Sequence, residues 1–233
     1  MTDIGRAERG GAAGPRDVAG RTVLIAGATS ASGAAAVRVL LDAGAEPIAV
    51  GRDAGKLAPL ATLGARVEAC DLASAAEIGA LAARLRADDV RVDGVLHLVG
   101  GWRGGGGLAG QTDTDYRFLE TGLTALRHVT RAFDADLRAA ASARLAIVSS
   151  TAVARPLAGG ANYATVKAAE EAWARAVAQG FAKAARDAGD PLRAASVIFR
   201  VKALAGLEDR LAEAYAGLWE RDAAEINDTV VEL

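Results

Sequence analysis

The sequence predicts an α/β protein in which one parallel sheet of seven strands is flanked by helices on both faces, a doubly wound arrangement. Short runs of β-branched and aliphatic residues alternate with longer segments rich in Ala, Leu and Arg, which is the pattern of repeated βαβ units. Several short runs are apolar at consecutive positions, as in Val23-Leu24-Ile25, and such strands are typically buried on both sides. A chain of 233 residues fits one domain of this kind, since a single core can grow to about 250–300 residues.

The expected elements alternate along the whole chain. Strands are expected at Thr22–Ala28, Pro47–Gly51, Arg66–Cys70, Val92–Val99, Arg144–Ser150, Ala194–Phe199 and Asp228–Glu232. Helices are expected where apolar residues recur at steps of three and four. These segments are Ala31–Ala43, Asp53–Leu63, Ser74–Asp88, Thr112–Ala141, Ala161–Ala188 and Leu207–Arg221. Gly100–Gly110 and Arg200–Gly206 are expected to be loops.

The composition is that of a folded protein without an excess of charge. Hydrophobic residues make up 52%, charged residues 24%, and the net charge is −2. The arginines are scattered among acidic residues, so a small molecule is a better expected partner than a nucleic acid. No run reaches the roughly eighteen apolar residues of a membrane span, and the N-terminal segment lacks the apolar stretch of a signal peptide. We therefore expect a flexible tail over residues 1–20 and a single domain over 21–233, in the cytoplasm and away from membranes.

The metal-binding residue types are sparse. Cys70 is the only cysteine, so the chain cannot form an intramolecular disulfide or a cysteine-based metal cluster, which fits a reducing cytoplasm. It is expected to be buried at the end of a strand. His97 is expected to be packed or hydrogen-bonded within the fold, and His128 to lie on the surface or at an interface. No metal site is expected.

A turn containing two glycines follows the first expected strand directly. It reads Ala26-Gly27-Ala28-Thr29-Ser30-Ala31-Ser32-Gly33, and a helical pattern comes after it. Glycine lets the backbone approach a pyrophosphate, and the amides and dipole at the helix N-terminus attract phosphate. The spacing alone is weak evidence, because an ordinary strand-to-helix turn also satisfies it. Its place in the first βα unit favours a dinucleotide-binding, Rossmann-type domain, with contacts expected from Gly27, Thr29, Ser30, Ala31, Ser32 and Gly33.

The end of the second expected strand indicates which dinucleotide would bind. An NAD-binding domain typically has an acidic residue here, which holds the adenosine ribose hydroxyls. This chain has Gly51 and Arg52 instead. Gly51 leaves room, and the Arg52 guanidinium suits a 2′-phosphate. NADP(H) is therefore the expected cofactor and NAD(H) the alternative. A second interpretation of Arg52 is that it faces solvent in the turn before a helix and binds no phosphate.

Tyr163 and Lys167 are four residues apart on an expected helix, so their side chains lie on one face and can act together. The chain has only three tyrosines and four lysines, so this spacing rarely arises by chance.

With this pair, the chain from Arg21 to Leu233 resembles the short-chain dehydrogenase/reductase family. The resemblance implies that Tyr163 is the general acid/base, and that Lys167 binds the nicotinamide ribose and lowers the pKa of the phenol, as a nearby cation should. It also implies that a serine thirteen residues before the tyrosine orients the substrate carbonyl. Ser150 holds that place, with Ser149 as the second candidate. Without the resemblance, both serines would be an ordinary strand end.

Two further stretches resemble the family's cofactor site. Asp71 and Leu72 follow the third expected strand, as does the family's adenine-contacting pair, although a turn aspartate is the alternative for Asp71. The segment His97-Leu98-Val99-Gly100 takes the place of the family's Asn-Asn-Ala-Gly and keeps only the glycine. Val99 and Gly100 are the contacts that this implies.

Three departures from the family pattern bear on activity. Ala31 replaces the middle glycine of the cradle, which is tolerated if its backbone φ is negative. Gly122 replaces an asparagine whose backbone usually holds a water between the lysine and solvent, and its carbonyl is expected to remain available for that role. After the sixth strand the family has a Pro-Gly turn that leads to a substrate-covering loop. This chain has Arg200-Val201-Lys202 there instead, so the covering loop is expected to be short or absent.

The residues together predict an NADP(H)-dependent oxidoreductase that transfers hydride to or from a carbonyl or alcohol, with Ser150, Tyr163 and Lys167 as catalytic residues. The alternative is a non-catalytic NADP(H)-binding sensor or scaffold, which the three departures favour. An epimerase or dehydratase on the same fold is not separated from a reductase by the sequence.

The remaining expectations concern aromatic residues and assembly. Trp102 and Trp219 are expected to pack in the core or at an interface, with substrate contact as the alternative. The Ala-rich helices 112–141 and 161–188 and the family resemblance imply a homodimer or homotetramer built on these two helices.

Overall fold

The computed structural model describes residues 17–233, and its centre is one parallel sheet with the strand order β3-β2-β1-β4-β5-β6-β7. The chain thus builds the sheet outward from β1 in one direction and from β4 in the other. The strands are β1 Thr22–Ala26, β2 Glu46–Gly51, β3 Arg66–Ala69, β4 Gly94–His97, β5 Ala143–Ser150, β6 Ala194–Val201 and β7 Thr229–Glu232. The seven-stranded, doubly wound α/β fold predicted from the sequence is confirmed.

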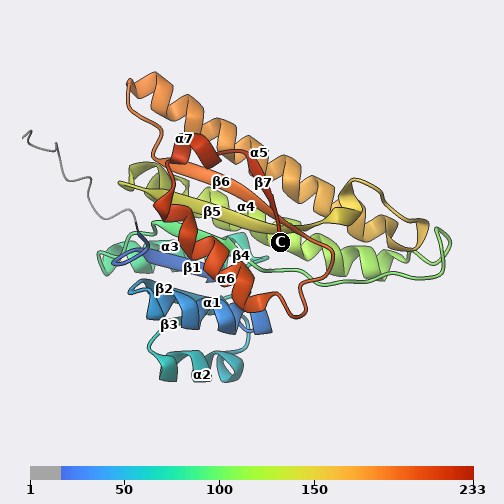
Figure 1. The fold of residues 1–233 in the computed structure, drawn as a ribbon. Coiled ribbons are helices and arrows are strands. Elements are labelled where there is room, and N and C mark those ends of the chain that lie inside the picture. Colours follow the sequence, from blue (N-terminus) through green and yellow to red (C-terminus); the bar gives the residue numbers. More distant parts are fainter. Residues whose placement is uncertain (1–16) are drawn as a thin grey trace, which may run out of the picture.

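Helices cover both faces of this sheet (Figure 1). One face carries α1 Ala31–Asp42, α2 Ala54–Leu63, α6 Glu208–Ala216 and α7 Ala223–Ile226. The other face carries α3 Ala75–Ala87, α4 Asp113–Ala139 and α5 Ala161–Ala188.

The central strands are buried on both sides. Val23 and Ile25 of β1 belong to the core cluster that includes α1 and α6, whereas Leu24 belongs to the cluster that includes α3 and α4. All three side chains are fully buried. Because successive side chains of a strand point to opposite faces, helices on both faces require apolar residues at consecutive positions, which explains the pattern in the sequence.

Several boundaries differ from those predicted. β4 is shorter than Val92–Val99: it spans Gly94–His97, and the backbone at Leu98 and Val99 then lies close to Gly27 at the end of β1. The final helical segment divides at Gly217 into α6 and the 3-10 turn Gly217–Glu220, since glycine is a poor helix former, and α7 follows it. The 3-10 turns Thr151–Val153 and Ala158–Gly160, between β5 and α5, were not expected.

The predicted boundary between the tail and the domain, at residue 20, lies too late in the sequence. Residues 1–16 lie outside the described residues. Val18, however, is only 3% exposed and packs into the core, so the fold begins before Arg21. Within residues 17–233, no helix is long and apolar enough to span a bilayer, and no group of His, Cys, Asp and Glu side chains is arranged to hold a metal ion.

Trp219 packs inside the protein, as expected. Its side chain lies edge-on to Tyr215, with the ring centroids 5.3 Å apart, and its indole N–H donates to the carbonyl oxygen of Ser142 at 3.3 Å. Gly94 of β4 makes room for it, because a Cβ at that position would lie 2.7 Å from the Trp219 ring. This aromatic pair therefore fastens the C-terminal segment to the sheet.

Candidate active site

The order of the strands creates a crevice at one edge of the sheet. β1 and β4 are neighbours, but the connections after them lead in opposite directions, and ligands bind at the carboxyl ends of strands at such a switch point. A cavity of about 790 Å³ and a second of about 200 Å³ open there. Ser30, Val99 and Gly100 line both cavities, so the two adjoin each other.

The turn between β1 and α1 forms a cradle of backbone amides. The Ser30 hydroxyl caps α1: it accepts from the amide of Gly33 and donates to the carbonyl oxygen of Gly27, both at 3.1 Å. The amides of Ala31 and Ser32 have no protein acceptor among residues 17–233. Free amides at the N-terminus of a helix are the groups that attract a phosphate.

The two glycines of this turn serve close packing. Gly27 has a φ of +87°, and a Cβ there would lie 3.0 Å from the backbone of Leu98 and Val99. A Cβ at Gly33 would lie 2.3 Å from the carbonyl oxygen of Ala28. Gly33 therefore permits close approach of helix and strand, and it lines neither cavity.

Ala31 meets the condition under which an alanine is tolerated in the cradle. Within the described residues, the only non-glycine residues with positive φ are Asp89 and Asp228, so Ala31 keeps a negative φ. Its methyl group is exposed at the first position of α1, and it lines neither cavity.

The smaller cavity contains the residues expected to hold the adenosine half of a dinucleotide. It is lined by Gly27, Thr29, Ser30, Gly51, Arg52, Asp71, Leu72, Val99 and Gly100, among others. Arg52 is exposed at the end of β2 and forms no ion pair within the described part of the chain. A Cβ at Gly51 would lie 2.9 Å from a methyl group of Thr29, so this glycine makes room for the threonine beside the cavity.

Asp71 serves the turn as well as the cavity. Its carboxylate accepts from the amide of Ala73 at 3.0 Å, and its own amide donates to Glu77 at 2.7 Å. Cys70, beside it, is buried as expected, and burial raises the pKa of its thiol to about 11. A thiol with that pKa stays protonated at neutral pH and is a poor nucleophile.

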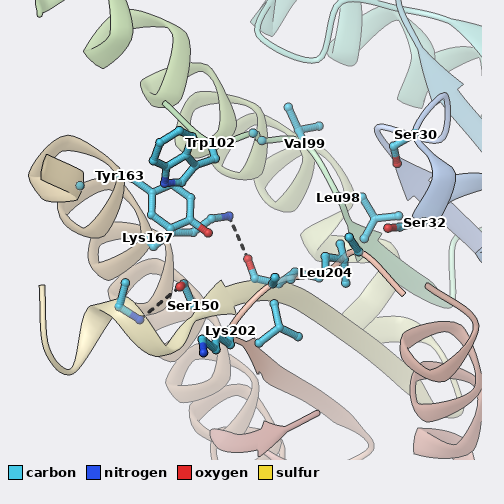
Figure 2. Close-up of a pocket in the computed structure, with 18 of the residues that line it drawn as sticks. Ser30, Ser32, Leu98, Val99, Trp102, Ser150, Tyr163, Lys167, Lys202 and Leu204 are labelled. Carbon is cyan, nitrogen blue, oxygen red and sulfur yellow. Dashed lines mark hydrogen bonds between the residues drawn. The ribbon is translucent and has the colours of Figure 1, made fainter. Parts of the chain in front are cut away.

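Ser150, Tyr163 and Lys167 line the larger cavity together (Figure 2). Ser150 ends β5, and Tyr163 and Lys167 lie on the first turns of α5. The Ser150 oxygen accepts from the amide of Ala152 at 3.1 Å, which leaves its hydroxyl hydrogen for another acceptor. The structure thus brings together the three residues that the sequence singled out.

Ser149 points to the other face of the sheet. It is fully buried, lies outside the cavity, and its hydroxyl donates to Glu171 at 2.7 Å. The alternation of side chains along β5 therefore separates the two serine candidates in favour of Ser150.

The Lys167 ammonium is held at two of its three hydrogens. Its Nζ donates to the carbonyl oxygen of Val148 at 2.9 Å, a bond drawn in Figure 2, and to Glu170 at 2.7 Å. A Cβ at Gly100 would lie 3.5 Å from Nζ, so the ammonium also faces Gly100 at the cavity wall.

His97 is packed and hydrogen-bonded, as expected. Its Nε2 lies 3.1 Å from the carbonyl oxygen of Gly122, which can only accept, so Nε2 carries the hydrogen. Burial, assisted by the positive charge of Lys167, lowers the pKa of His97 to about 3, and the ring stays neutral. Its Nδ1 is buried without a protein partner. His128, on α4, is half-buried.

The carbonyl of Gly122 was expected to remain free for a water, and that expectation is wrong. α4 continues unbroken through Gly122, so its carbonyl already accepts a bond within the helix. His97 occupies the second lone pair. No acceptor site is left at this carbonyl for a water that would reach Lys167.

For Trp102, packing in the core was one of the expectations, and the structure does not bear it out. It is 61% exposed and lines the cavity near Tyr163 instead of packing in the core (Figure 2). The Gly-rich loop that carries it offers few side chains to cover it. Leu157 and Leu204 also line the cavity, and sequence reasoning missed both because they lie in loops without a recognisable pattern.

The crevice, the amide cradle and the serine, tyrosine and lysine in one cavity define a dinucleotide-binding α/β enzyme. The family model described as short chain dehydrogenase matches residues 21–185. The chain belongs to this family of oxidoreductases.

Solved structures of similar fold carry the same family description. A putative short chain dehydrogenase from Pseudomonas syringae is 23% identical, with 95% of this chain and 98% of that chain covered at a TM-score of 0.80. A putative short chain dehydrogenase from Shigella flexneri, complexed with NADP, is 20% identical, with 94% and 99% covered at 0.80. An NADPH-bound short chain oxidoreductase from Pseudomonas aeruginosa with an atypical catalytic center is 19% identical, with 94% and 97% covered at 0.78. No curated protein matches the chain.

Proposed function

We propose that this protein is an NADP(H)-dependent oxidoreductase that reduces a carbonyl group or oxidises the corresponding alcohol. The observation that carries the proposal is a single cavity of about 790 Å³ lined by cradle residues at one end and by Ser150, Tyr163 and Lys167 at the other. A dinucleotide whose phosphates lay at the N-terminus of α1 would have its nicotinamide beside these three side chains.

The residues present fit an NADP(H) molecule. The free amides of Ala31 and Ser32 would hold the pyrophosphate, Asp71 and Leu72 would contact the adenine, and Arg52 would bind the 2′-phosphate. Solved structures of similar fold contain NADP, which supports the same choice. When bound, the nicotinamide ring supplies or accepts the hydride.

The chain's own residues would handle the proton. Ser150 has a free hydroxyl hydrogen, which would hold the substrate oxygen by a hydrogen bond as negative charge develops there. The Tyr163 phenol would donate its proton to that oxygen during reduction and remove it during oxidation. Lys167, held at Val148 and Glu170, would direct its remaining N–H group to the nicotinamide ribose.

The cavity wall favours a substrate with a sizeable apolar part. Trp102, Leu157 and Leu204 line it, and the short connection Lys202–Leu207 covers one side. A short covering segment leaves the site open to bulky substrates.

The decisive experiment is a screen of ketones and aldehydes with NADPH, repeated with Tyr163→Phe. We expect the wild type to oxidise NADPH with some of these carbonyl compounds, and Tyr163→Phe to lose at least about a hundredfold in kcat because the proton donor is gone. Its affinity for NADPH should stay within about threefold of the wild type. If both proteins bind NADPH and neither turns over any carbonyl compound, the non-catalytic sensor or scaffold is the better description.

Cofactor choice is tested at Arg52. We expect Arg52→Ala to weaken NADPH binding by about ten- to a hundredfold, since a charge-assisted contact to the 2′-phosphate is lost. NADH binding should be unchanged, and titration by nicotinamide fluorescence measures both. Equal effects on the two cofactors would place the 2′-phosphate elsewhere.

We also propose that the protein is cytoplasmic and assembles as a homodimer or homotetramer through α4 and α5. These helices share an outer groove lined by Arg131, Trp173 and Gly180, among others, where a second copy could pack. Light scattering tests this directly, and a monomer at micromolar concentration would exclude it.

A further inference from the structure

Gly122 on α4 and Glu170 on α5 fit against each other. A Cβ at Gly122 would lie 2.8 Å from Oε1 of Glu170 and 3.0 Å from the carbonyl oxygen of Val99. Glycine in the middle of a helix weakens it, yet only glycine fits here without moving the glutamate. The two residues are 48 positions apart, but each has the size that the other allows.

The Glu170 carboxylate is almost fully buried, at 1% exposure. Its other oxygen, Oε2, lies 2.7 Å from Nζ of Lys167. A carboxylate in such a place is costly unless it is paired, and Lys167 is the one charged group that bonds to it among the described residues. Burial raises the pKa of Glu170, although the ammonium of Lys167 works in the opposite direction.

Lys167 is held by Glu170 and Val148, and not by the backbone of α4. The carbonyl oxygen of Gly122 is taken by the helix and by His97, so it cannot hold the ammonium through a water. Glu170 and Val148 instead fix two hydrogens of the ammonium. Because the three N–H directions are tetrahedral, fixing two of them sets the direction of the third.

We propose that Glu170 is a positioning residue for Lys167, and that Gly122 is the residue on α4 that leaves room for its carboxylate. Glu170 lines neither cavity and acts through the ammonium of Lys167. The inference rests on the proposed role of Lys167 in binding the nicotinamide ribose.

The test is a cycle of variants at the two positions, with NADPH affinity measured by nicotinamide fluorescence. We expect Glu170→Val to weaken NADPH binding at least about tenfold, because the ammonium loses its charged partner. Gly122→Asn alone should have a similar effect, because the new side chain displaces the Glu170 carboxylate. The double variant should bind within about threefold of the wild type, because the asparagine amide then fills the space and accepts from Lys167.

Two further variants separate positioning from folding. Glu170→Gln keeps the shape of the side chain and an oxygen that accepts from Lys167, but it removes the charge. It should therefore weaken NADPH binding in the same direction as Glu170→Val and by a smaller factor, and it gives this reading even if the valine variant folds poorly. Glu171→Gln removes the neighbouring buried carboxylate, which does not contact Lys167. It should lower the unfolding temperature and leave NADPH affinity within about twofold of the wild type.

Weaker NADPH binding by Glu170→Gln, which keeps the size of the side chain, is a result that a purely structural role would not produce. The proposal is overturned if Glu170→Gln and Glu170→Val bind NADPH like the wild type, or if the double variant binds no better than the weaker of the single variants. A wild-type protein that binds neither NADPH nor NADH removes the proposed function, and this inference with it. The two failures are therefore distinguishable in one titration series.

Discussion

Two neighbouring carboxylates on α5 lie in opposite surroundings. Glu170 is turned toward the active site, packs against Gly122 and bonds to a single cation, Lys167. Glu171 is turned toward β5 and β6, where it accepts from the Ser149 hydroxyl at 2.7 Å and from two nitrogens of Arg200 at 2.8 and 2.6 Å. Both are buried, at 1% and 5% exposure.

The number of hydrogen-bond donors around each carboxylate decides whether its pKa lies above or below the ordinary value of a glutamate. Burial raises the pKa of Glu170, and one ammonium does not offset it. Burial also raises the pKa of Glu171, but the hydrogen bonds from Arg200 and Ser149 and the charge of Arg200 more than compensate, so its pKa falls below the ordinary value. Glu171 thus fastens α5 to the sheet. Glu170 is held where burial disfavours its charge, beside the reactive centre, and ionisable groups in such places are typically functional.

The largest expected effect on stability comes from Glu171. Glu171→Gln replaces charged hydrogen bonds to Arg200 with weaker ones and leaves a guanidinium, 21% exposed, without its anion. We expect the free energy of unfolding to fall by about 1.5–3 kcal/mol. Urea unfolding followed by circular dichroism measures this. A change below about 0.5 kcal/mol would mean that the Arg200 pair contributes nothing to the fold.

A smaller effect is expected at Glu170. Glu170→Gln removes a charge that burial disfavours, while the glutamine oxygen and Val148 still accept from Lys167 at the edge of the cavity. We expect the free energy of unfolding to change by less than about 1 kcal/mol in either direction. The same urea series reports it. If Glu170→Gln destabilised the protein more than Glu171→Gln, the contrast between the two carboxylates would be lost.

The smallest effects are expected in the pH dependence of the free energy of unfolding. The contributions of Glu170 and Glu171 to this dependence should have opposite signs. The folded-state pKa of Glu171 is lowered, so its stabilising contribution is complete above about pH 4.5 and is lost as the pH falls through the folded-state value. The folded-state pKa of Glu170 is raised, so the folded state binds the extra proton and gains stability as the pH falls toward 4.5. Each glutamine variant should remove only the contribution of the replaced glutamate to the slope of unfolding free energy against pH. Urea unfolding between pH 3 and 7 measures this slope. Parallel curves for the two variants would contradict this.

Local spacing was enough to predict the core of the site. Tyr163 and Lys167 share a helix face because they are four residues apart, and the cradle directly follows a strand, so neither depends on distant contacts. The parallel sheet with helices on both faces followed from the alternation of segments and the usual way in which βαβ units connect, whereas the order of its strands was not predicted.

Contacts between distant segments could not be predicted in the same way. Gly122 and Glu170 lie on different helices, and only the packing of α4 against α5 shows that one makes room for the other. The bond from His97 to the carbonyl of Gly122 likewise joins β4 to α4. A glutamate three residues after Lys167, on a helix rich in alanine, was the one signal in the sequence that could have prompted the question.

The close approach at Gly33 sets a limit on redesign of the coenzyme preference. Any side chain there would strike the Ala28 carbonyl oxygen, push α1 away from β1 and misalign the amides that would face a pyrophosphate. Ala31 and Arg52 are exposed and carry no such constraint. An engineer exchanging one dinucleotide for another therefore has freedom at positions 31 and 52, and none at position 33.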